Sequence, residues 1–268
     1  MSKTNYTSNL SDSEWDILRP LLFPKKGYGE NKGRPLDHDE REIVNACFYI
    51  LRTGSQWRLL PGDFPPYPVV FHHFNKWRKK GTWELVNDVL TRNVRKKAGR
   101  DEEPSVAIID SQSVKTSEQN CERGYDAGKK IKGRKRHIIT DVLGLVLAVV
   151  VHSANIQDRD GARLLLDHLD YSRPQLEKVW ADSGYSGELE EWVSELRDDD
   201  HQIELEIVRG KPQQIGFEVQ PWRWIVERTF SWISKNRRMS KDYEVYEDTS
   251  RTMIFMAMSR IMLKRLTT

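Results

Sequence analysis

Two apolar segments that each end in an aspartate constrain the fold of this chain more than any other sequence feature. Residues 106–110 read VAIID and residues 178–182 read KVWAD. Short apolar runs of this kind predict buried strands. Between them, residues 134–152 (RKRHIITDVLGLVLAVVVH) predict a β-hairpin that turns at residues 141–144. The hairpin allows the two apolar strands to lie side by side, so we expect Asp110 and Asp182 at one edge of a sheet.

Each aspartate also has a structural interpretation, because Asp is a favoured residue in turns and at strand ends. Taken alone, Asp110 is more simply a turn residue than a ligand. Two carboxylates side by side, however, repel each other and raise each other's pKa, which a Mg²⁺ ion between them relieves. Ser183 and Gly184 follow the second aspartate and allow a tight exit with the backbone close to a bound group. The pair therefore indicates a metal site.

A third carboxylate, Glu227, lies in residues 221–240, which predict a helix. The neighbours within about 40° of it on a helical wheel are all polar: Gln220, Arg223, Ser231, Ser234 and Arg238. The opposite face is mostly apolar and contains Trp222, Ile225, Val226, Thr229, Trp232 and Ile233. A glutamate on a polar face is usually a solvated residue, but a helix so rich in Trp and Ile must dock on the sheet.

Composition limits the class of protein. The length of 268 residues permits one large domain or two ordinary ones, and we expect two. Residues 1–98 carry 17 Lys or Arg and 11 Asp or Glu, a net charge of +6, against −3 for the remaining 170 residues. A basic region suggests a polyanion as partner, with an ordinary solvated surface as the alternative. We expect a soluble protein, because no apolar run approaches the roughly 20 residues of a membrane span. The start of the sequence lacks the apolar core of a signal peptide, and there are only two cysteines, which favours a reducing, cytoplasmic setting.

The predicted secondary structure changes near residue 100, from helices alone to a mixture of strands and helices. Before it, Ser11 and Glu14 form a capping box, and residues 39–53 have helical spacing that closes at Gly54. Further helices are predicted over residues 69–78 and 83–97, and residues 96–105 read as a linker. After it, strands and helices alternate, which predicts a mixed α/β domain. Beyond the strands already named, its elements are helices near residues 159–169, 188–200 and 221–240 and an edge strand at 203–208.

The carboxylates Asp110, Asp182 and Glu227, in the order strand, strand and helix, resemble the DDE triad of transposases with a ribonuclease H-like catalytic fold. The segments IIDSQSVK, GRKRHIITDVLG, WADSGYSG and RWIVERTFSWISKNRRMSKDYE are similar to those of bacterial insertion-sequence transposases of family five. So are LSDSEWDILRPLL and GRPLDHDEREIVNACFYILRTGSQWRLLP in the front half. The resemblance covers about residues 10–265. It implies an α/β, ribonuclease H-like mixed-sheet catalytic domain at residues 99–268, preceded by a mostly α-helical DNA-binding domain at residues 1–98.

The resemblance also implies a chemistry, which is two-metal phosphoryl transfer. The three carboxylates would be both catalytic residues and metal ligands, holding two Mg²⁺ ions for which Mn²⁺ substitutes. The implied partners are DNA, as terminal inverted repeats and as target, and at least one more copy of the chain in a synaptic complex. The implied location is the bacterial cytoplasm, at the nucleoid and not at a membrane. Two alternatives stay open: a ribonuclease H-like nuclease without strand transfer, and a DNA-binding repressor derived from a transposase.

One departure from the family pattern concerns the residue that holds DNA. Related transposases carry the signature Tyr, two residues, Arg, three residues, Glu, six residues, Lys. Arg223 and Glu227 match it, but a glutamine stands at the Tyr position and Ser234 at the Lys position. Lys235 comes one residue late, about 80° from Glu227 on the wheel, whereas Arg238 returns to the same face. We therefore expect Arg238 to make the main phosphate contact and Lys235 a secondary one.

Other basic residues are expected to contact DNA. The run KKIKGRKR at residues 129–136 precedes the hairpin and favours phosphate contact over a merely solvated loop. The helix at residues 69–78 follows the break at Gly54 in a helix-turn-helix-like arrangement, although the connection is long for that motif. Residues 32–35 read KGRP and resemble the core of a minor-groove arm, in which Arg34 would enter the groove, with a surface turn as the simpler interpretation. The expected DNA contacts are Lys115, Lys129, Lys130, Lys132, Arg134, Lys135, Arg136, Arg223, Arg228, Lys235, Arg238, His72, Asn75, Lys76, Arg78 and Arg34.

Three further aspartates have local structural interpretations. Asp158 and Asp160 lie just ahead of a predicted helix, where they read as helix caps and not as a fourth metal ligand. Asp141 reads as a turn residue of the hairpin. The adjacent histidines His72 and His73 indicate surface or DNA contact more than a metal site, because neighbouring side chains on a helix point apart.

Overall fold

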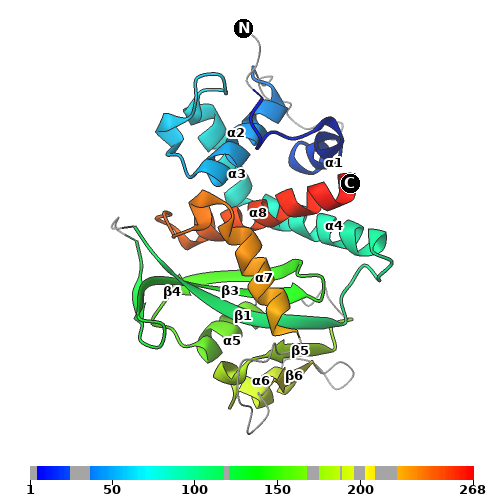
Figure 1. The fold of residues 1–268 in the computed structure, drawn as a ribbon, viewed down its shortest axis with the longest axis vertical. Helices are drawn as coiled ribbons and strands as arrows, with labels where there is room; N and C mark the ends of the chain where they lie inside the picture. Colours follow the sequence, from blue (N-terminus) through cyan, green and yellow to red (C-terminus); the bar gives the residue numbers. More distant parts are fainter. Residues whose placement is uncertain are drawn as a thin grey trace, which may run out of the picture.

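The computed structural model of the chain describes residues 5–24, 37–117, 121–167, 175–187, 189–195, 203–208 and 222–268. In this part of the chain, a mixed sheet has helices on both faces, and further helices lie at one end of the molecule (Figure 1). Arg34 and Gln220, which the sequence singles out, lie outside the described residues. None of the described helices combines the length and the apolar character that crossing a bilayer requires.

The N-terminal helices begin and end where the sequence predicts. In the capping box, the Ser11 hydroxyl accepts from the Glu14 N–H at 3.2 Å, and the Glu14 carboxylate accepts from the Ser11 N–H at 2.8 Å. Gly54 ends the second helix with a left-handed φ of 75°, which glycine adopts without strain. The elements before the sheet are α1 (Asp12–Leu22), α2 (Glu40–Thr53), the 3₁₀ turn η1 (Trp57–Leu59), α3 (Tyr67–Lys79) and α4 (Thr82–Lys97).

The sheet has the strand order β2-β3-β1-β5-β6, with β4 also paired to β3. β1 lies antiparallel to β3 and parallel to β5. The strand that carries Asp110 and the strand that ends just before Asp182 are therefore neighbours, as predicted. The strands are β1 (Val106–Lys115), β2 (Gly124–Asp126), β3 (Ile131–Asp141), β4 (Val146–Ser153), β5 (Lys178–Ala181) and β6 (Glu204–Ile207).

The β3–β4 hairpin turns where the sequence predicts. Asp141 is the expected turn residue, because its Oδ1 accepts from the N–H groups of Leu143 and Leu145 at 2.9 and 2.8 Å. It is also fully buried and forms an ion pair with Arg95 of α4. The turn thus connects the sheet to the helical part of the molecule.

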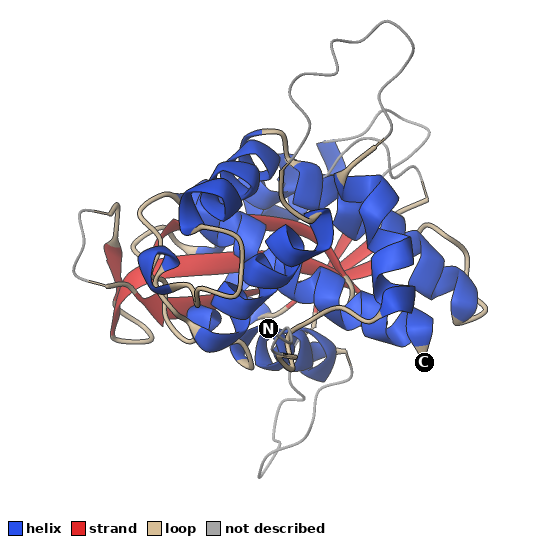
Figure 2. Cartoon of the chain, turned by 90° about the horizontal axis from the view of Figure 1, so that it is seen from above, coloured by secondary structure: helices blue, strands red, loops and turns tan. Residues whose placement is uncertain are grey.

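Each face of the sheet packs against its own hydrophobic core, because side chains alternate along a strand. Ile108 and Ile138 contribute to one core, and their neighbours Ile109 and Ile139 contribute to the other. Figure 2 shows the helices of the first face lying over the strands. The C-terminal helices of the first face are α7 (Arg223–Ser234) and α8 (Glu247–Thr267), and the helices of the second face are α5 (Asp158–Asp167) and α6 (Leu189–Glu195).

α8 is absent from the predicted elements. Its apolar residues surround the helix and do not form a stripe, and Met253, Phe255 and Met258 are all buried. The helix packs against α4 and β4 and also contacts α1, α2 and α3. One continuous core therefore joins the N-terminal helices, α7, α8 and the sheet. The change from helical to strand-forming sequence near residue 100 therefore lies within one core.

Two strands differ from prediction. β1 continues past Asp110 to Lys115, because β3 pairs with it along this length. The expectation that Asp110 lies at the end of its strand is therefore wrong, and its carboxylate projects from the middle of β1. β3 begins at Ile131, so most of the basic run at residues 129–136 is strand and not loop.

Candidate active site

Asp110 and Asp182 lie beside each other on the face of the sheet that α7 covers. In the parallel pair β1 and β5, Ile108 lies opposite Trp180, and each aspartate follows by two positions. Side chains two residues apart share a face, so the two carboxylates are on one side. Both line a cavity of about 20 Å³ together with Arg223, which is space for one water molecule or one metal ion.

Asp110 is poorly solvated. Burial raises its pKa to about 6, and the negative charge of Asp182 adds to the rise. The Ser111 N–H opposes the rise by donating to Asp110 Oδ1 at 2.7 Å, and the positive charges of Lys129 and Arg223 act in the same direction. A divalent cation beside the two aspartates would favour the charged form of Asp110 in the same way.

Asp182 leaves β5 and caps a 3₁₀ turn, η2 (Ser183–Tyr185). Its Oδ1 accepts from the Gly184 N–H at 2.9 Å. A Cβ atom at position 184 would lie 3.0 Å from that same oxygen, so glycine gives the backbone room for this approach. The tight exit agrees with the expectation from the sequence, and it fixes one oxygen of the carboxylate.

Glu227 is exposed on α7, one turn after Arg223. Arg223 Nε lies 3.1 Å from Glu227 Oε1, and Arg223 Nη2 lies 3.7 Å from Asp182 Oδ2. Among the residues that the structure describes, no three His, Cys, Asp or Glu side chains are close enough to hold a metal ion together. The structure thus brings Asp110 and Asp182 together and connects Glu227 to them through Arg223.

α7 docks on the sheet with the predicted face. The Thr229 hydroxyl donates to the Gly144 carbonyl at 2.9 Å and so ties the helix to the hairpin turn. Trp222 differs from prediction, because it precedes the helix at a φ of 78°. Its ring stacks on Trp180 at 4.5 Å and covers one side of the small cavity. The buried residues of α7 are Ile225, Val226, Thr229, Phe230 and Ile233.

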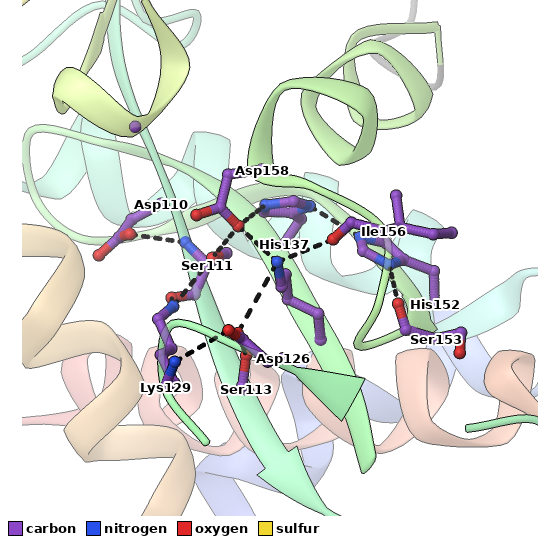
Figure 3. Close-up of polar contacts among 12 residues, drawn as sticks. Asp110, Ser111, Ser113, Asp126, Lys129, His137, His152, Ser153, Ile156 and Asp158 are labelled. Atoms are coloured by element: carbon purple, nitrogen blue, oxygen red, sulfur yellow. Dashed lines mark hydrogen bonds and ion pairs between the residues drawn. The ribbon is translucent and has the colours of Figure 1, made fainter. Parts of the chain in front are cut away.

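A buried polar network lies on the opposite face of β1, behind Asp110 (Figure 3). The Ser111 hydroxyl donates to Asp158 Oδ1 at 2.9 Å, and Lys135 Nζ lies 2.9 Å from the same oxygen. Lys129 Nζ donates to the Ser111 carbonyl at 3.1 Å. Asp158 is the first residue of α5, and the predicted helix cap does not account for these contacts with β1 and β3. Through Ser111, the network supports the residue that orients Asp110.

Two histidines extend this network. His137 Nδ1 and His152 Nε2 lie 2.9 Å apart, and His137 Nε2 lies 3.5 Å from Asp158 Oδ1. Burial lowers the pKa of His137 to about 4 and also lowers the pKa of His152. A period of two along β3 directs Lys135 and His137 to the same face, and this spacing is the sequence signal that could have revealed the network.

Three basic residues that we expected to contact DNA are buried. Arg134 and Arg136 are each 1% exposed and Lys135 is 4% exposed. The two arginines project to the face opposite Lys135, where they donate to backbone carbonyls in residues 239–245. The expectation of DNA contact is wrong for all three, because they hold parts of the protein together. The exposed members of the expected set in this region are Lys115, Lys129, Lys130 and Lys132.

Arg238 is not on the helix face of the third carboxylate. α7 ends at Ser234, and Arg238 belongs to a 3₁₀ turn, η3 (Arg237–Met239). Its Nε lies 2.6 Å from Glu244 Oε1, its Nη1 donates to the Ser55 carbonyl at 3.1 Å, and its side chain is 9% exposed. The prediction that Arg238 contacts a phosphate is wrong. It assumed that the helix continues to residue 240, whereas α7 ends at Ser234, so the helical wheel does not apply to Arg238.

Arg228 is also engaged within the protein. Its guanidinium lies between the rings of Trp224 and Trp232, at 4.4 and 4.6 Å from their centroids, and donates to the Leu143 carbonyl at 3.2 Å. These contacts replace the DNA contact expected of Arg228. Lys235, by contrast, is exposed at the C-terminal end of α7.

The residues expected to read DNA in α3 are only partly available. His72 and Lys76 are exposed. Asn75 and Arg78 are half-buried, and Arg78 Nε donates to Asn75 Oδ1 at 3.3 Å. Arg78 also lies 3.9 Å from Asp248 of α8. His72 and Lys76 therefore form the accessible part of this set.

Comparison with known proteins agrees with the two halves of the structure. Residues 101–262 match the family model of the transposase DDE domain, and residues 10–87 match that of putative transposases of the IS4/5 family. The sheet, α5 to α7 and most of α8 fall within the first match, and α1 to α3 fall within the second. No solved structure is significantly similar to the chain.

Two relatives come from Burkholderia cepacia. The putative transposase for insertion sequence element IS402 is 32% identical over 121 residues, which are 42% of this chain and 54% of that protein. An uncharacterized 16.2 kDa protein of insertion element IS402 is 27% identical over 124 residues, which are 46% of this chain and 78% of that protein. The match thus spans about half of the putative transposase. Because the transposase DDE model covers more than half of the chain, the chain belongs to the DDE-domain transposases and has their ribonuclease H-like mixed α/β fold.

Proposed function

We propose that this transposase binds the terminal inverted repeats of an insertion sequence and catalyses metal-dependent cleavage at the 3′ ends, followed by strand transfer into target DNA. The observation that carries the proposal is the placement of Asp110 on β1 and of Asp182 directly after the adjacent parallel strand β5, so that both line one cavity, with Glu227 on the helix beside it. Three carboxylates on two strands and a helix are the arrangement that the family resemblance implies.

The residues at the site suit Mg²⁺, for which Mn²⁺ would substitute. Asp110 and Asp182 offer hard oxygen ligands that line one cavity. Glu227 would complete the ligand set from α7, where its exposed side chain is free to turn away from Arg223. When bound, a pair of such ions activates the attacking oxygen and stabilises the leaving oxygen of a phosphodiester.

The protein supplies orientation and charge around these carboxylates. The Ser111 N–H fixes one oxygen of Asp110, and the Gly184 N–H fixes one oxygen of Asp182. Arg223 lies between the helix and the sheet, where its fork of N–H donors suits a DNA phosphate at the cavity. A single site with these groups would serve both reactions, because in each a hydroxyl oxygen attacks a phosphodiester and a 3′-hydroxyl leaves. Water is the nucleophile when the element end is cleaved, and the freed 3′-hydroxyl is the nucleophile when one phosphodiester is exchanged for another in strand transfer.

The DNA-binding part of the proposal rests on charge. Residues 1–98 have a net charge of +6, and exposed lysines lie where the end of β1 pairs with the start of β3, at positions 115, 129, 130 and 132. We assign reading of the element's ends to residues 1–98 and chemistry to residues 99–268. Two ends must be held at once, so we propose at least a homodimer in the synaptic complex, acting on the bacterial nucleoid in the cytoplasm.

A joining assay separates this function from its alternatives. The substrate is a labelled duplex that carries an end of the source element, incubated with the full chain, Mg²⁺ and a second DNA. A transposase joins the label to the second DNA. Cleavage without joining would instead assign a ribonuclease H-like nuclease, and binding without cleavage would assign a repressor.

A further inference from the structure

A second cavity lies at the opposite end of α7 from the two aspartates. It has a volume of about 360 Å³, and its walls come from the segment before α1, from α2, from the C-terminal end of α7 and from α8. Four cationic side chains line it, and no acidic side chain among the described residues does. These are Arg52, Lys235, Arg260 and Lys264. A concave site with one sign of charge concentrates ions of the opposite sign.

Three of these cations have no carboxylate partner in the described part of the chain. Arg260 is neutralised by Glu14, whose Oε2 lies 2.5 Å from Arg260 Nη1. Among the described residues, no carboxylate forms an ion pair with Arg52, Lys235 or Lys264. Arg52 Nη1 donates to the backbone carbonyl of Lys235 at 2.7 Å, which holds these two cations side by side. The cavity therefore gathers uncompensated positive charge from α2, α7 and α8.

A buried hydroxyl in the wall of the cavity also lacks a partner. Ser8 is 7% exposed, and its Oγ makes no hydrogen bond within the described structure. Buried hydroxyls in folded proteins are nearly always hydrogen-bonded. The Ser8 oxygen itself is covered by protein atoms, so a bound anion would be held by the three exposed cations, which an anion with several acceptor oxygens suits. A phosphate has this chemistry.

α7 reaches both cavities: Arg223 and Val226 near its N-terminal end line the cavity of the two aspartates, and Trp232 and Lys235 at its C-terminal end line the second cavity. Lys235 caps the helix eight residues after Glu227, which corresponds to about 12 Å along the helix axis. A DNA strand advances about 3.4 Å per nucleotide, so this distance spans about three to four nucleotides. A strand that runs along α7 from the aspartates would bring a phosphate to the cavity.

We propose that this cavity binds a backbone phosphate of the DNA strand that occupies the active site, about three to four nucleotides from the cleaved phosphate. The inference rests on the proposed function and deepens it. It assigns DNA contact to Arg52 and Lys264, which come from the helical part of the molecule, beside Lys235 of α7.

Lysine footprinting on the full chain tests this assignment. The chain is acetylated with and without a duplex that carries an end of the source element, and peptide mass spectrometry gives the rate for each lysine. We expect DNA to slow acetylation of Lys235 and Lys264 several-fold. Lys241, an exposed lysine outside residues 1–98 that does not line the cavity, is the control and should react at an unchanged rate.

The pattern of protection separates this inference from the proposed function. Protection of Lys129 near the aspartates without protection of Lys235 and Lys264 would overturn the phosphate cavity and leave the proposed function standing. No protection of any lysine would overturn both, because the chain would then not bind the DNA. The acetylation is also repeated with inorganic phosphate in place of the DNA, at the same concentration of phosphate groups. Equal protection by it would overturn the assignment to a DNA strand in favour of a site for free phosphate.

The salt dependence of DNA binding gives a second measure. Lys264→Gln and Arg52→Gln should each lower the slope of log K against log salt, and the two changes together by up to about 0.9, the value for one phosphate contact. Arg100→Gln, which removes an exposed charge away from the cavity, should leave the slope unchanged. Arg52 also holds the Lys235 carbonyl, so Lys264→Gln is the variant free of an effect on folding. Unchanged slopes in both cavity variants would reject the proposal.

Discussion

The guanidinium of Arg223 lies 3.1 Å from the carboxylate of Glu227, one turn away on α7. The same guanidinium reaches toward Asp182, with 3.7 Å between Nη2 and Oδ2. Arg223 therefore supplies the positive charge between helix and sheet that a divalent cation would supply in a three-carboxylate site. A cation bound by both Asp182 and Glu227 would displace this guanidinium and free it to contact a phosphate.

Neutralising any of the three carboxylates should abolish cleavage of an element end. Asp110→Asn, Asp182→Asn and Glu227→Gln keep the side-chain shape and remove one negative ligand. Even loss of an outer partner of a metal ligand costs about 10- to 100-fold, so we expect a larger loss here. End binding, measured by gel shift, should stay near the wild-type level. Near wild-type cleavage by Glu227→Gln alone would remove Glu227 from the site and leave the aspartate pair.

Removing the positive charge of Arg223 should strengthen metal binding and weaken catalysis. In Arg223→Gln, Mn²⁺ no longer competes with a guanidinium for Asp182 and Glu227, so its dissociation constant without DNA should fall several-fold. Cleavage should fall as well, because the donor fork for the phosphate is lost. Titration of free Mn²⁺ by electron paramagnetic resonance measures the first effect. Arg237→Gln, an exposed cation away from the cavity, is the control.

The strands and helices around the site follow from local sequence patterns. The capping box at Ser11, the glycine at position 54 and the hairpin turn at Asp141 are each specified by residues close in the chain, and each is found as predicted. The extension of β1 past Asp110 was not predictable in this way. It depends on pairing with β3, which is distant in sequence, and the polar residues after Asp110 carry no apolar pattern of their own.

Long-range contacts also explain the errors among the basic residues. Arg134, Lys135 and Arg136 look like a solvated cluster in sequence, but their partners are carbonyls and carboxylates from distant segments. A run of charge cannot reveal such partners. The end of α7 at Ser234 was equally hidden, since no glycine or proline marks it. Arg238 consequently turns inward toward Glu244.

Arg238 should therefore contribute to stability, and its removal should not change DNA affinity. Arg238→Ala leaves the carboxylate of Glu244 buried without its ion-pair partner, which costs about 3–5 kcal/mol of unfolding free energy. Urea denaturation measures this loss. The neighbouring Arg237 is exposed, and Arg237→Ala should change stability by less than about 0.5 kcal/mol.

A double variant separates the ion pair from other effects of Arg238. Arg238→Met combined with Glu244→Gln removes both charges, so it should recover part of the stability that Arg238→Ala loses. A stable Arg238→Ala with a reduced salt slope for DNA binding would contradict this account. That result would indicate that Arg238 contacts DNA.

Burial keeps His137, behind the site, neutral in the folded protein. His137 is fully buried, and its pKa of about 4 in the folded protein lies below the ordinary value of 6.5. The unfolded chain therefore takes up a proton on His137 at a higher pH than the folded protein does. The contribution of His137 to stability is complete above pH 6.5 and is lost as the pH falls toward 4. The full loss is about 3 kcal/mol, from 1.36 kcal/mol for each pKa unit.

Urea denaturation of the wild type and of His137→Gln across this range isolates the effect from other titrating groups. The glutamine variant should be less stable at pH 7, because the contacts of His137 with His152 and Asp158 are lost. Its stability should fall less steeply between pH 6.5 and 4, by up to about 1.4 kcal/mol per pH unit relative to the wild type. His72→Gln, which changes an exposed histidine, should follow the wild-type curve. Parallel curves for the wild type and His137→Gln would mean that His137 accepts a proton in the folded protein as readily as in the unfolded chain, and that its ring is not held neutral by burial.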